Sequence, residues 1–262
     1  MHIAGLHTYP VKGCRRLDHD EAVTEPWGLA GDRRWMVIDP DGVGITQRQA
    51  PALALLRAVP RPGGITINGF DVAEPVDAPK ETVRVFGSKP PFPVRIAAAG
   101  PVLTELLGRP ARLAWLGDPT VRPIERNARD SDRVSFADGY PVLLTSEASL
   151  AALNAELDEP VPMTRFRPNV VVAGAGAWEE DRWAGGRLRL GGVTFRVAEG
   201  CARCVVTTID QETGAKGGEP LRTLGRMRRV DGRLLFGVTL IPDELPGETH
   251  VIRAGEPVLS VS

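Results

Sequence analysis

Two cysteines that stand three positions apart, Cys201 and Cys204, are the clearest chemical signal in the sequence. A run of β-branched residues follows the second cysteine and predicts a strand over Cys204–Ile209. Thiolates bind soft metals, form disulfides and act as nucleophiles, so a pair at this spacing points to a redox or metal site.

Four interpretations of the cysteine pair are open at this point. A structural zinc site needs four nitrogen or sulfur ligands, whereas the chain has no second cysteine pair and its four histidines lack metal-ligand spacing. A thioredoxin-like pair lies at the start of a helix, whereas a strand is expected here. One thiolate could instead bind a soft, redox-active metal whose other ligands come from a cofactor. In the fourth interpretation both cysteines are inert residues of the buried core.

A second set of residues, scattered along the chain, has the types that bind phosphate and heterocyclic rings. Lys12 lies in a tight turn between a proline and a glycine, directly after a predicted strand. Arg33 precedes a hydrophobic strand, and Arg48 follows an Asp-Gly turn. Arg167 and Asn169 flank a proline and would share a face at the start of an apolar strand. Because proline donates no backbone hydrogen bond, these two side chains are left to recognise a ligand there.

Each of these residues also has a plain structural explanation. An exposed lysine after a strand, such as Lys12, is usually solvated. Period-two alternation would place Arg33 on the same face as Trp35, where it either rims a pocket or pairs with Asp32. Asp138 precedes an apolar run and can simply start a turn.

The composition limits the kind of ligand that the chain can bind. Its 262 residues are 42% hydrophobic and 25% charged, with 32 basic and 33 acidic side chains, which is the balance of a globular protein and not of a disordered one. A net charge of -1 gives no basis for binding nucleic acid or an anionic membrane surface, because both need a basic excess. Any anion site must therefore be local.

The cysteine content and the amino terminus indicate where the protein resides. Three cysteines, a small and odd number, fit a reducing compartment better than a secreted, disulfide-bonded scaffold. The amino terminus lacks a basic start followed by an apolar export segment, and no later run approaches about 18 apolar residues. The sequence thus predicts an intracellular, cytoplasmic protein without a membrane span.

The elements expected to position the site residues are mostly strands. The 29 glycines and 23 prolines separate short runs of valine, isoleucine and threonine, which is typical of a β-rich protein. Strands are predicted over Ile3–Val11, Trp35–Asp39, Gly64–Ile67, Thr82–Val85, Val94–Ala97, Asn169–Ala173, Arg187–Ala198, Cys204–Ile209, Leu234–Ile241 and Val258–Val261, with turns such as Gly191-Gly192 between some of them.

Two segments have helical patterns. These are Pro101–Leu107 and Ser146–Leu157, the second with an apolar stripe and with Ser146 as its N-cap. A proline-rich connector precedes residues 97–100, so we expect one domain over residues 1–97 and another over residues 98–262. Strands outnumber helices without regular alternation, which disfavours a doubly wound α/β fold and favours two packed β-rich halves, with barrels as one form they could take.

Eight short motifs together resemble one family. They are Tyr9-Pro-Val-Lys-Gly-Cys14, Gly31-Asp-Arg-Arg-Trp35, Thr46-Gln-Arg-Gln49, Asp138-Gly-Tyr-Pro141, Ser146-Glu-Ala-Ser-Leu150, Phe166-Arg-Pro-Asn169, Glu180-Asp-Arg-Trp183 and Cys201-Ala-Arg-Cys204 with the six residues after it. Their order over almost the whole chain resembles molybdenum-cofactor proteins in which a MOSC domain follows a MOSC N-terminal β-barrel domain. The sequence is similar to the molybdenum-dependent amidoxime-reducing component family and its bacterial relatives.

This resemblance implies an α+β, mostly β fold. An N-terminal β-barrel-like MOSC_N domain would occupy residues 1–97, and a MOSC β-barrel domain with a few flanking helices would occupy residues 98–262. The cavity between them would hold the molybdenum cofactor, which is a molybdenum ion bound to a phosphorylated pterin, molybdopterin.

The resemblance also implies roles for individual residues. Cys204 matches the protein ligand to molybdenum and is a catalytic residue, whereas Cys201 is a supporting residue. Asp138 matches a catalytic acid near the open face of the metal, where it takes part in proton supply. The residues that would surround the cofactor are Lys12, Gly13, Arg33, Arg48, Gly139, Tyr140, Arg167, Asn169, Ala202 and Arg203. Gly13 stands where relatives often carry serine, and Gly139-Tyr140 replaces small hydroxyl residues.

By this resemblance the chain reduces small N-hydroxylated compounds, such as amidoximes, hydroxylamines and N-hydroxylated base analogues, to amines or amidines. No cysteine follows Cys204, so a separate protein of reductase, ferredoxin or cytochrome type would donate the electrons. Neither nucleic acid nor a membrane is expected as a partner. The alternative is a carrier that passes the cofactor, or a sulfur atom bound to Cys204, to client enzymes. A third reading is a degenerate MOSC domain that binds neither.

Overall fold

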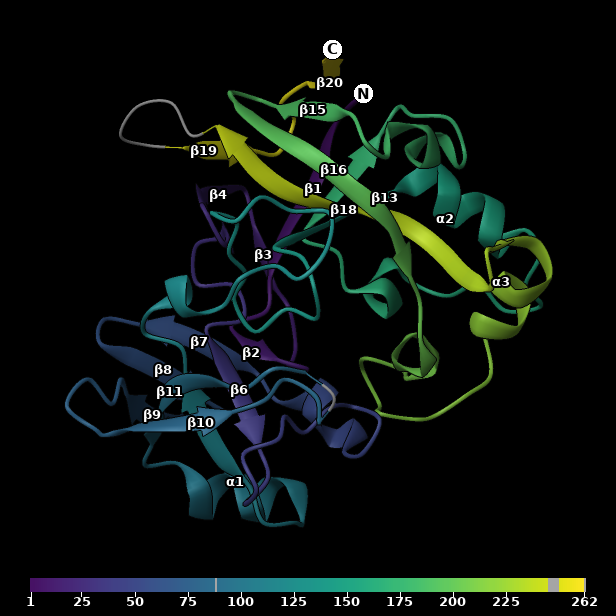
Figure 1. The fold of residues 1–262 in the computed structure, drawn as a ribbon. Helices are drawn as coiled ribbons and strands as arrows, with labels where there is room; N and C mark the ends of the chain where they lie inside the picture. Colours follow the sequence, from purple (N-terminus) through teal and green to yellow (C-terminus); the bar gives the residue numbers. More distant parts are fainter. Residues whose placement is uncertain (88, 245–249, 262) are drawn as a thin grey trace.

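The structure, a computed structural model, describes residues 1–87, 89–244 and 250–261 and consists mainly of strands (Figure 1). Its largest sheet has nine strands in the order β20-β15-β16-β18-β13-β14-β1-β3, with β17 pairing to β18 off this path. Neighbouring strands are antiparallel except β13 and β14. The strands span β1 His2–Thr8, β3 Leu17–His19, β13 Val142–Ser146, β14 Val170–Ala173, β15 Arg187–Leu190, β16 Val193–Ala202, β17 Arg229–Val230, β18 Arg233–Glu244 and β20 Val258–Val261.

A second main sheet of five strands occupies the lower part of Figure 1, in the order β10-β11-β12-β6-β2. Its strands span β2 Val11–Lys12, β6 Trp35–Ile38, β10 Lys80–Val83, β11 Phe92–Ala97 and β12 Arg112–Trp115. Two three-stranded sheets, β19-β4-β5 and β7-β8-β9, complete the set. They contain β4 Glu21–Glu25, β5 Gly28–Leu29, β7 Ala58–Arg61, β8 Gly64–Ile67, β9 Phe70–Ala73 and β19 Val251–Arg253.

The helices are short and lie around the sheets. The α-helices are α1 Gly100–Leu107, α2 Glu147–Asn154 and α3 Leu221–Met227, and the 3-10 helices are η1 Pro51–Leu55, η2 Pro119–Val121, η3 Met163–Phe166, η4 Glu179–Trp183 and η5 Val205–Thr208. Among the described residues, no helix combines the length and the apolar character needed to cross a bilayer. The mostly β fold expected from the sequence is confirmed.

The first predicted strand, Ile3–Val11, is divided at Pro10 into two strands of different sheets. β1 pairs with β14 and β3 in the large sheet, whereas β2 pairs with β6 in the five-stranded sheet. Proline has no backbone N–H with which to continue a ladder. The preceding N–H, of Tyr9, donates instead to the Asp32 carboxylate at 2.7 Å. The chain therefore passes from one main sheet to the other here, and this passage places Lys12.

Most other predicted strands are confirmed with shifted ends. The range Arg187–Ala198 forms a hairpin of β15 and β16 around the predicted Gly191-Gly192 turn. In the five-stranded sheet β6 begins at Trp35 as expected. The strand predicted from Asn169 begins one residue later, at Val170.

The strand predicted over Cys204–Ile209 is wrong, because this segment forms η5. The Thr207 hydroxyl donates to the Cys204 carbonyl oxygen at 2.9 Å, and the Thr208 hydroxyl donates to the Val205 carbonyl oxygen at 2.8 Å. Such local side-chain bonds compete with a strand ladder for the backbone. The tight turn keeps Cys204 at the edge of the segment instead of inside a sheet.

Both predicted helices exist, with changed ends. Helix α1 begins one residue earlier than predicted, and α2 ends at Asn154 instead of Leu157. Ser146 does occupy the N-cap position of α2, but its side chain makes no capping bond. Ser146 also ends β13 and is fully buried, and its hydroxyl has no hydrogen-bond partner among the described residues. The capping role predicted for Ser146 is therefore wrong.

No single boundary in the sequence separates the strands of the two main sheets. β11 ends at Ala97 and pairs with β12, which follows the expected boundary. β1 and β3, from the amino-terminal part, belong to the large sheet. The division into residues 1–97 and 98–262 stays a prediction.

Apolar clusters fill the space beside each main sheet. Phe195 of β16 is fully buried in the cluster of the large sheet. β6 is buried on both faces, with Trp35 and Val37 in one cluster and Met36 and Ile38 in another. This period of two is the side-chain alternation of a strand, and burial on both faces makes β6 a rigid support for the turn before it.

We predict that Phe195→Ala lowers the free energy of unfolding by about 3–5 kcal/mol, because it removes a large buried ring and leaves a cavity. Leu259→Ala, at a 42% exposed position of β20, should change it by less than about 0.5 kcal/mol. Urea unfolding of the two variants beside the wild type measures both values. Equal stability of the two variants would contradict the assignment of this core.

Candidate functional site

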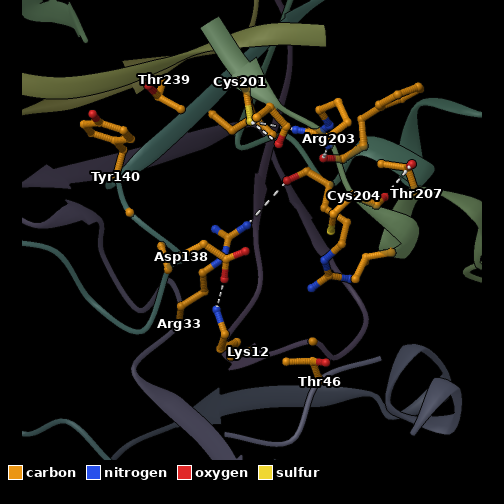
Figure 2. A pocket seen from close by; sticks show the side chains of 18 of the residues that line it. Lys12, Arg33, Thr46, Asp138, Tyr140, Cys201, Arg203, Cys204, Thr207 and Thr239 are labelled. Atoms are coloured by element: carbon orange, nitrogen blue, oxygen red, sulfur yellow. Dashed lines mark hydrogen bonds and ion pairs between the residues drawn. The ribbon is translucent and has the colours of Figure 1, made fainter. Parts of the chain in front are cut away.

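A cavity of about 430 Å³ opens where loops from the two main sheets meet (Figure 2). Its wall combines the turn after β2, the segment before β13, the loop after η3 and the end of β16. The twelve residues singled out from the sequence all line it: Lys12, Gly13, Arg33, Arg48, Asp138, Gly139, Tyr140, Arg167, Asn169, Ala202, Arg203 and Cys204. The fold thus brings together residues that lie almost 200 positions apart.

The cavity wall is strongly basic, although the chain as a whole is nearly neutral. Its basic residues are Lys12, Arg33, Lys89, Arg48, Arg126, Arg165, Arg167, Arg203 and Arg233. Its carboxylates are Asp138 and Glu199. Such a concentration of one sign of charge in a concave wall attracts an anion. A local anion site, as the composition requires, would fit this wall.

Lys12 and Asp138 form an ion pair in this wall (Figure 2). Lys12 Nζ also donates to the Phe136 carbonyl oxygen at 2.8 Å, and the Lys12 side chain is 9% exposed, so it is not the solvated lysine of the plain explanation. Burial lowers the pKa of Lys12 to about 8, although Asp138 raises it.

The Asp138 carboxylate lies in the cavity wall, and its side chain is 65% exposed. Partial desolvation raises the pKa of Asp138, but the charge and the hydrogen bond of Lys12 outweigh it and hold this pKa well below its usual range. At neutral pH the proton of the pair therefore resides on Lys12 Nζ.

Arg122 holds the segment that carries Asp138, and no sequence motif points to it. Its guanidinium donates to the carbonyl oxygens of Ser135, of Ala137 at 2.6 Å and of Asp138 at 3.4 Å. Arg122 is 6% exposed, and burial lowers its pKa to about 10, although Asp138 raises it. Its hydrogen bonds fix the backbone next to the ion pair.

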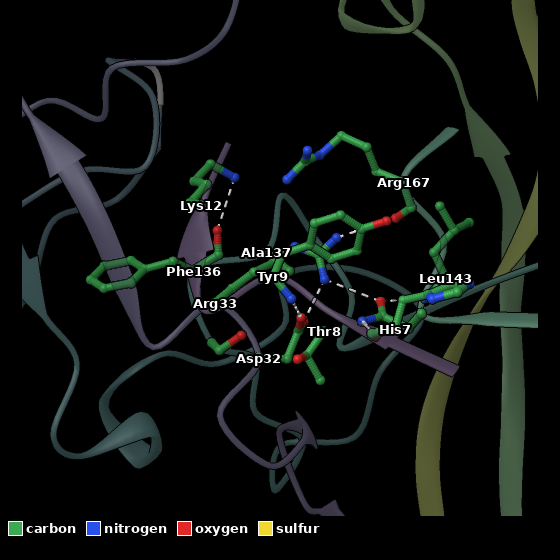
Figure 3. A network of polar contacts seen from close by, with 12 residues as sticks. His7, Thr8, Tyr9, Lys12, Asp32, Arg33, Phe136, Ala137, Leu143 and Arg167 are labelled. Atoms are coloured by element: carbon green, nitrogen blue, oxygen red, sulfur yellow. Dashed lines mark hydrogen bonds and ion pairs between the residues drawn. The ribbon is translucent and has the colours of Figure 1, made fainter. Parts of the chain in front are cut away.

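Arg33 does not follow the strand alternation that the sequence predicts. Its backbone is left-handed, with φ +48°, and β6 begins two residues later, at Trp35. Its side chain pairs with the buried Asp32 carboxylate (Figure 3). It also donates to Asn169 Oδ1 at 3.1 Å. The ion pair and the place in the cavity wall therefore coexist.

Arg167 is also left-handed, with φ +55°, at the end of η3. It precedes β14, so it does not share a strand face with Asn169 as predicted. Its guanidinium lies 4.2 Å from the Tyr9 ring centroid, and that of Arg33 lies 4.6 Å from the same ring. Arg167 Nη1 donates to Gln211 Oε1 at 3.0 Å. Nη2 is buried and has no hydrogen-bond partner within the described part of the chain.

Two buried amides connect the turn after β2 to the Arg167 loop. Gln47 Nε2 donates to the Gly13 carbonyl oxygen at 2.6 Å and to Gln211 Oε1 at 2.9 Å. Gln211 Nε2 donates back to Gln47 Oε1 at 3.0 Å. This reciprocal pair joins residues that lie 164 positions apart.

The two cysteines of the pair line the cavity and are partly exposed. The inert-core interpretation is therefore wrong for them, whereas it describes Cys14, whose pKa burial raises to about 12. Arg203 Nη1 donates to Cys201 Sγ at 2.9 Å. Arg48 lies in the same cavity wall, and the neighbouring Cys204 side chain raises the pKa of Arg48. Each thiol thus has a guanidinium beside it.

The other interpretations of the pair can be compared with the same geometry. Within residues 1–87, 89–244 and 250–261, no three or more His, Cys, Asp or Glu side chains are grouped so as to hold a metal. A zinc site made of protein ligands alone is thus not found there. The thioredoxin-like interpretation requires the pair to lie at the start of a helix. Cys201 and Cys204 are free thiols, and the helix after them, η5, has four residues.

Comparison with known proteins decides the family. Residues 131–259 match the MOSC domain, and residues 1–110 match the MOSC N-terminal beta barrel domain. The chain belongs to the MOSC family. The resemblance noted from the motifs is confirmed.

Individual relatives of this MOSC chain match it along almost its whole length. It is 32% identical over 291 residues to mitochondrial amidoxime-reducing component 1 of Xenopus laevis, which covers 99% of the chain and 82% of that relative. It is 33% identical over 281 residues to the Homo sapiens protein of the same name, with coverage of 98% and 82%. It is also 29% identical over 281 residues to molybdenum cofactor sulfurase of Oryza sativa subsp. japonica, over 96% of the chain and 34% of that protein.

Gly13, Gly139 and Tyr140, which depart from the family motifs, have different surroundings in this MOSC chain. Gly13 has φ +84°, a conformation that a serine would adopt only with strain. A Cβ at Gly139 would meet open space, so no steric constraint requires glycine there. The Tyr140 hydroxyl donates to the Arg126 carbonyl oxygen at 3.1 Å.

The MOSC cavity also contains residues that sequence reasoning missed. They are Thr46, Gln47, Phe86, Lys89, Arg126, Arg165, Phe166, Glu199, Val206, Thr207, Arg233 and Thr239. Thr46, Gln47, Arg165, Phe166 and Thr207 lie in or beside the quoted motifs, so their neighbours were a usable signal. The isolated basic residues Lys89, Arg126 and Arg233 carried none, because a single loop arginine is usually solvated.

We predict that Asp138→Asn lowers the pKa of Lys12 further below about 8, because the carboxylate that stabilises its charge is removed. NMR titration of the Lys12 side chain measures the shift. Asp130→Asn, which removes an exposed carboxylate outside the cavity wall, is the matched control and should leave the titration in place. An unchanged Lys12 titration in Asp138→Asn would contradict the ion pair.

Proposed function

We propose that this chain binds the molybdenum cofactor in the cavity and reduces small N-hydroxylated compounds, such as amidoximes, hydroxylamines and N-hydroxylated base analogues, to amidines or amines. One observation carries the proposal: a partly exposed thiol, Cys204, shares the cavity with three guanidinium groups that form no ion pair within the described residues. These groups belong to Arg48, Arg167 and Arg203. The names of the amidoxime-reducing relatives support the reaction.

The residues present fit this cofactor. Molybdopterin brings two sulfur ligands and a phosphate, so it requires one protein thiolate and a cationic wall. Arg165 Nε, Arg167 Nη2 and Arg203 Nε are buried without a hydrogen-bond partner in the described ranges. An unsatisfied buried donor costs about 1–3 kcal/mol, so an anion that accepts from or neutralises these groups would be stabilised. The cavity volume lies in the range of small-molecule sites.

In this proposal Cys204 is the protein ligand to molybdenum, and Cys201 supports the loop. The phosphate and the pterin are held by Lys12, Gly13, Arg33, Arg48, Gly139, Tyr140, Arg167, Asn169, Ala202 and Arg203. When bound, the cofactor would supply the two-electron redox chemistry. The chain itself binds and orients the reactants and supplies protons.

The reaction consumes protons, and the Lys12–Asp138 pair can provide one. Reduction of R–NH–OH by two electrons and two protons breaks the N–O bond and gives R–NH2 and water. Lys12 Nζ holds a proton at neutral pH, whereas Asp138 is ionised. Lys12 is therefore the proton donor of the pair, and Asp138 takes part by keeping Lys12 charged.

The electrons would come from a separate donor protein of reductase, ferredoxin or cytochrome type. The relatives named mitochondrial amidoxime-reducing component bear a location in their names. For this chain we retain the cytoplasm as the predicted location, on the reducing environment that its free thiols suit.

We predict that Cys204→Ser lowers the molybdenum content of the purified protein at least about tenfold, since it replaces a thiolate by a poorly matched hydroxyl. Cys201→Ser, a change of the same kind three residues away, should retain most of the metal. Elemental analysis after expression in a cofactor-competent host measures both. Equal metal in wild type and Cys204→Ser would overturn the ligand assignment, and none in the wild type would favour a degenerate MOSC domain.

We predict that turnover falls about tenfold per pH unit above about 8, because Lys12 loses the proton that it donates. The measurement is kcat/KM for benzamidoxime between pH 6 and 10, with reduced viologen as the electron source. Lys12→Arg should lower kcat/KM, because arginine does not release its proton in this range, and the activity that remains should lack this alkaline decline. A decline of the same shape in both proteins would remove Lys12 from the proton path.

A carrier of the cofactor or of sulfur is the second candidate. It is favoured by the match to molybdenum cofactor sulfurase, which covers 96% of the chain at 29% identity. The two functions differ in turnover. Metal-loaded protein with reduced viologen should consume benzamidoxime if it is a reductase, whereas a carrier should leave benzamidoxime unchanged and transfer cofactor or sulfur to an acceptor apoenzyme.

A further inference from the structure

Gln211 lies beside the cavity wall, and every polar position of its amide is bonded. Oε1 accepts from Gln47 Nε2 at 2.9 Å and from Arg167 Nη1 at 3.0 Å. Nε2 donates to Gln47 Oε1 at 3.0 Å and to the Ile209 carbonyl oxygen at 2.9 Å. A guanidinium only donates and a carbonyl only accepts, so these partners fix the orientation of the amide. Gln211 is 6% exposed and thus held firmly.

Three other cations of the cavity wall are paired with carboxylates. The pairs are Lys12 with Asp138, Arg33 with Asp32, and Arg165 with Asp210 at 3.0 Å. Arg167 differs from all three, because its side-chain acceptor is the neutral Gln211 and no ion pair of Arg167 occurs among the residues described. Its charge therefore remains uncompensated beside the cavity.

We infer that Gln211 is a positioning residue that holds Arg167 without neutralising it, so that Arg167 supplies a free positive charge for the anionic end of the cavity ligand. The inference deepens the proposed cofactor site. It rests on the proposed function, which identifies the anionic end of the ligand as a phosphate ester. Among the cations predicted to contact phosphate, it separates Arg167 from Lys12 and Arg33, which already carry carboxylates.

The chemistry of the alternatives explains why a neutral acceptor matters here. A carboxylate at position 211 would form an ion pair with Arg167 and cancel the charge that an anion needs. An apolar side chain would leave Arg167 Nη1 without this acceptor, and the guanidinium would be held mainly by its contact with the Tyr9 ring. Glutamine satisfies the hydrogen bond and preserves the charge.

A sulfate titration of the full chain tests this inference. Sulfate imitates the phosphate end of the cofactor and keeps two negative charges between pH 6 and 9. Calorimetry at low ionic strength compares the wild type with Gln211→Met, Arg167→Met and the double variant. Thr82→Met, which introduces the same thioether side chain at an exposed position of β10 outside the cavity wall, is the control.

If Gln211 acts through Arg167, each single variant should bind sulfate about tenfold more weakly, and the double variant should bind no more weakly than Arg167→Met. Thr82→Met should bind as the wild type does. Independent losses that multiply to about a hundredfold in the double variant would show that Gln211 acts by another route and would overturn the inference. Undiminished binding by Gln211→Met would overturn it as well.

A variant that changes charge gives a second criterion. Gln211→Glu should bind sulfate more weakly than Gln211→Met, because it adds a negative charge beside Arg167. Binding as strong as that of the wild type would contradict the inference. If the variants at position 211 do not fold, arginine side-chain NMR of the wild type replaces them. Sulfate should then shift the Arg167 signal more than that of Arg33, and the reverse order would contradict the assignment.

The sulfate experiment is independent of molybdenum. A chain that acquires no molybdenum but loses sulfate affinity through the Gln211–Arg167 pair would refute the proposed function and keep the inference about the anion site. A chain that acquires molybdenum but shows no dependence on Gln211 would refute the inference and keep the proposed function.

Discussion

Mutual repulsion of positive charges is the constraint around which the cavity is arranged. Arg33 and Arg167 contact the same Tyr9 ring, and repulsion between unit charges at such separations is strong where water is partly excluded. Asp32 compensates Arg33, and Asp138 compensates Lys12. These carboxylates make the cluster tolerable, and the cations left without one retain the capacity to bind an anion.

The backbone meets this constraint with conformations that a sequence pattern does not predict. Arg33 and Arg167 are left-handed non-glycine residues, which cost about 1–3 kcal/mol each and persist only where the surroundings hold them. Asp32 and Gln211 provide such support through their hydrogen bonds to the two guanidinium groups. The passage of the chain at Pro10 from one main sheet to the other brings Lys12 into the same wall. The strained backbones of Arg33 and Arg167 thus help to place their guanidinium groups in the cavity wall.

The residue types of the site and many of its residues could be predicted from the sequence, because thiols, guanidinium groups and prolines at strand ends can each be recognised within a short motif. It failed at Cys204–Ile209, where β-branched composition indicated a strand and threonine hydroxyls formed a 3-10 turn instead. It also missed Arg122 and Gln211. Arg122 binds carbonyl groups 13 to 16 positions away, and Gln211 binds Gln47, 164 positions away. Composition does not carry the information about such partners.

The sequence by itself determined the mostly β fold class, the MOSC family and the set of side chains able to bind a thiolate-ligated metal and an anion, since these follow from residue type, spacing and order. Only the tertiary structure decided which cations are neutralised, where the proton of the Lys12–Asp138 pair resides, and that Gln211 meets Arg167. The physical reason is that charge compensation and desolvation depend on distances of a few ångströms between distant parts of the chain, which exist only after the two sheets have packed together.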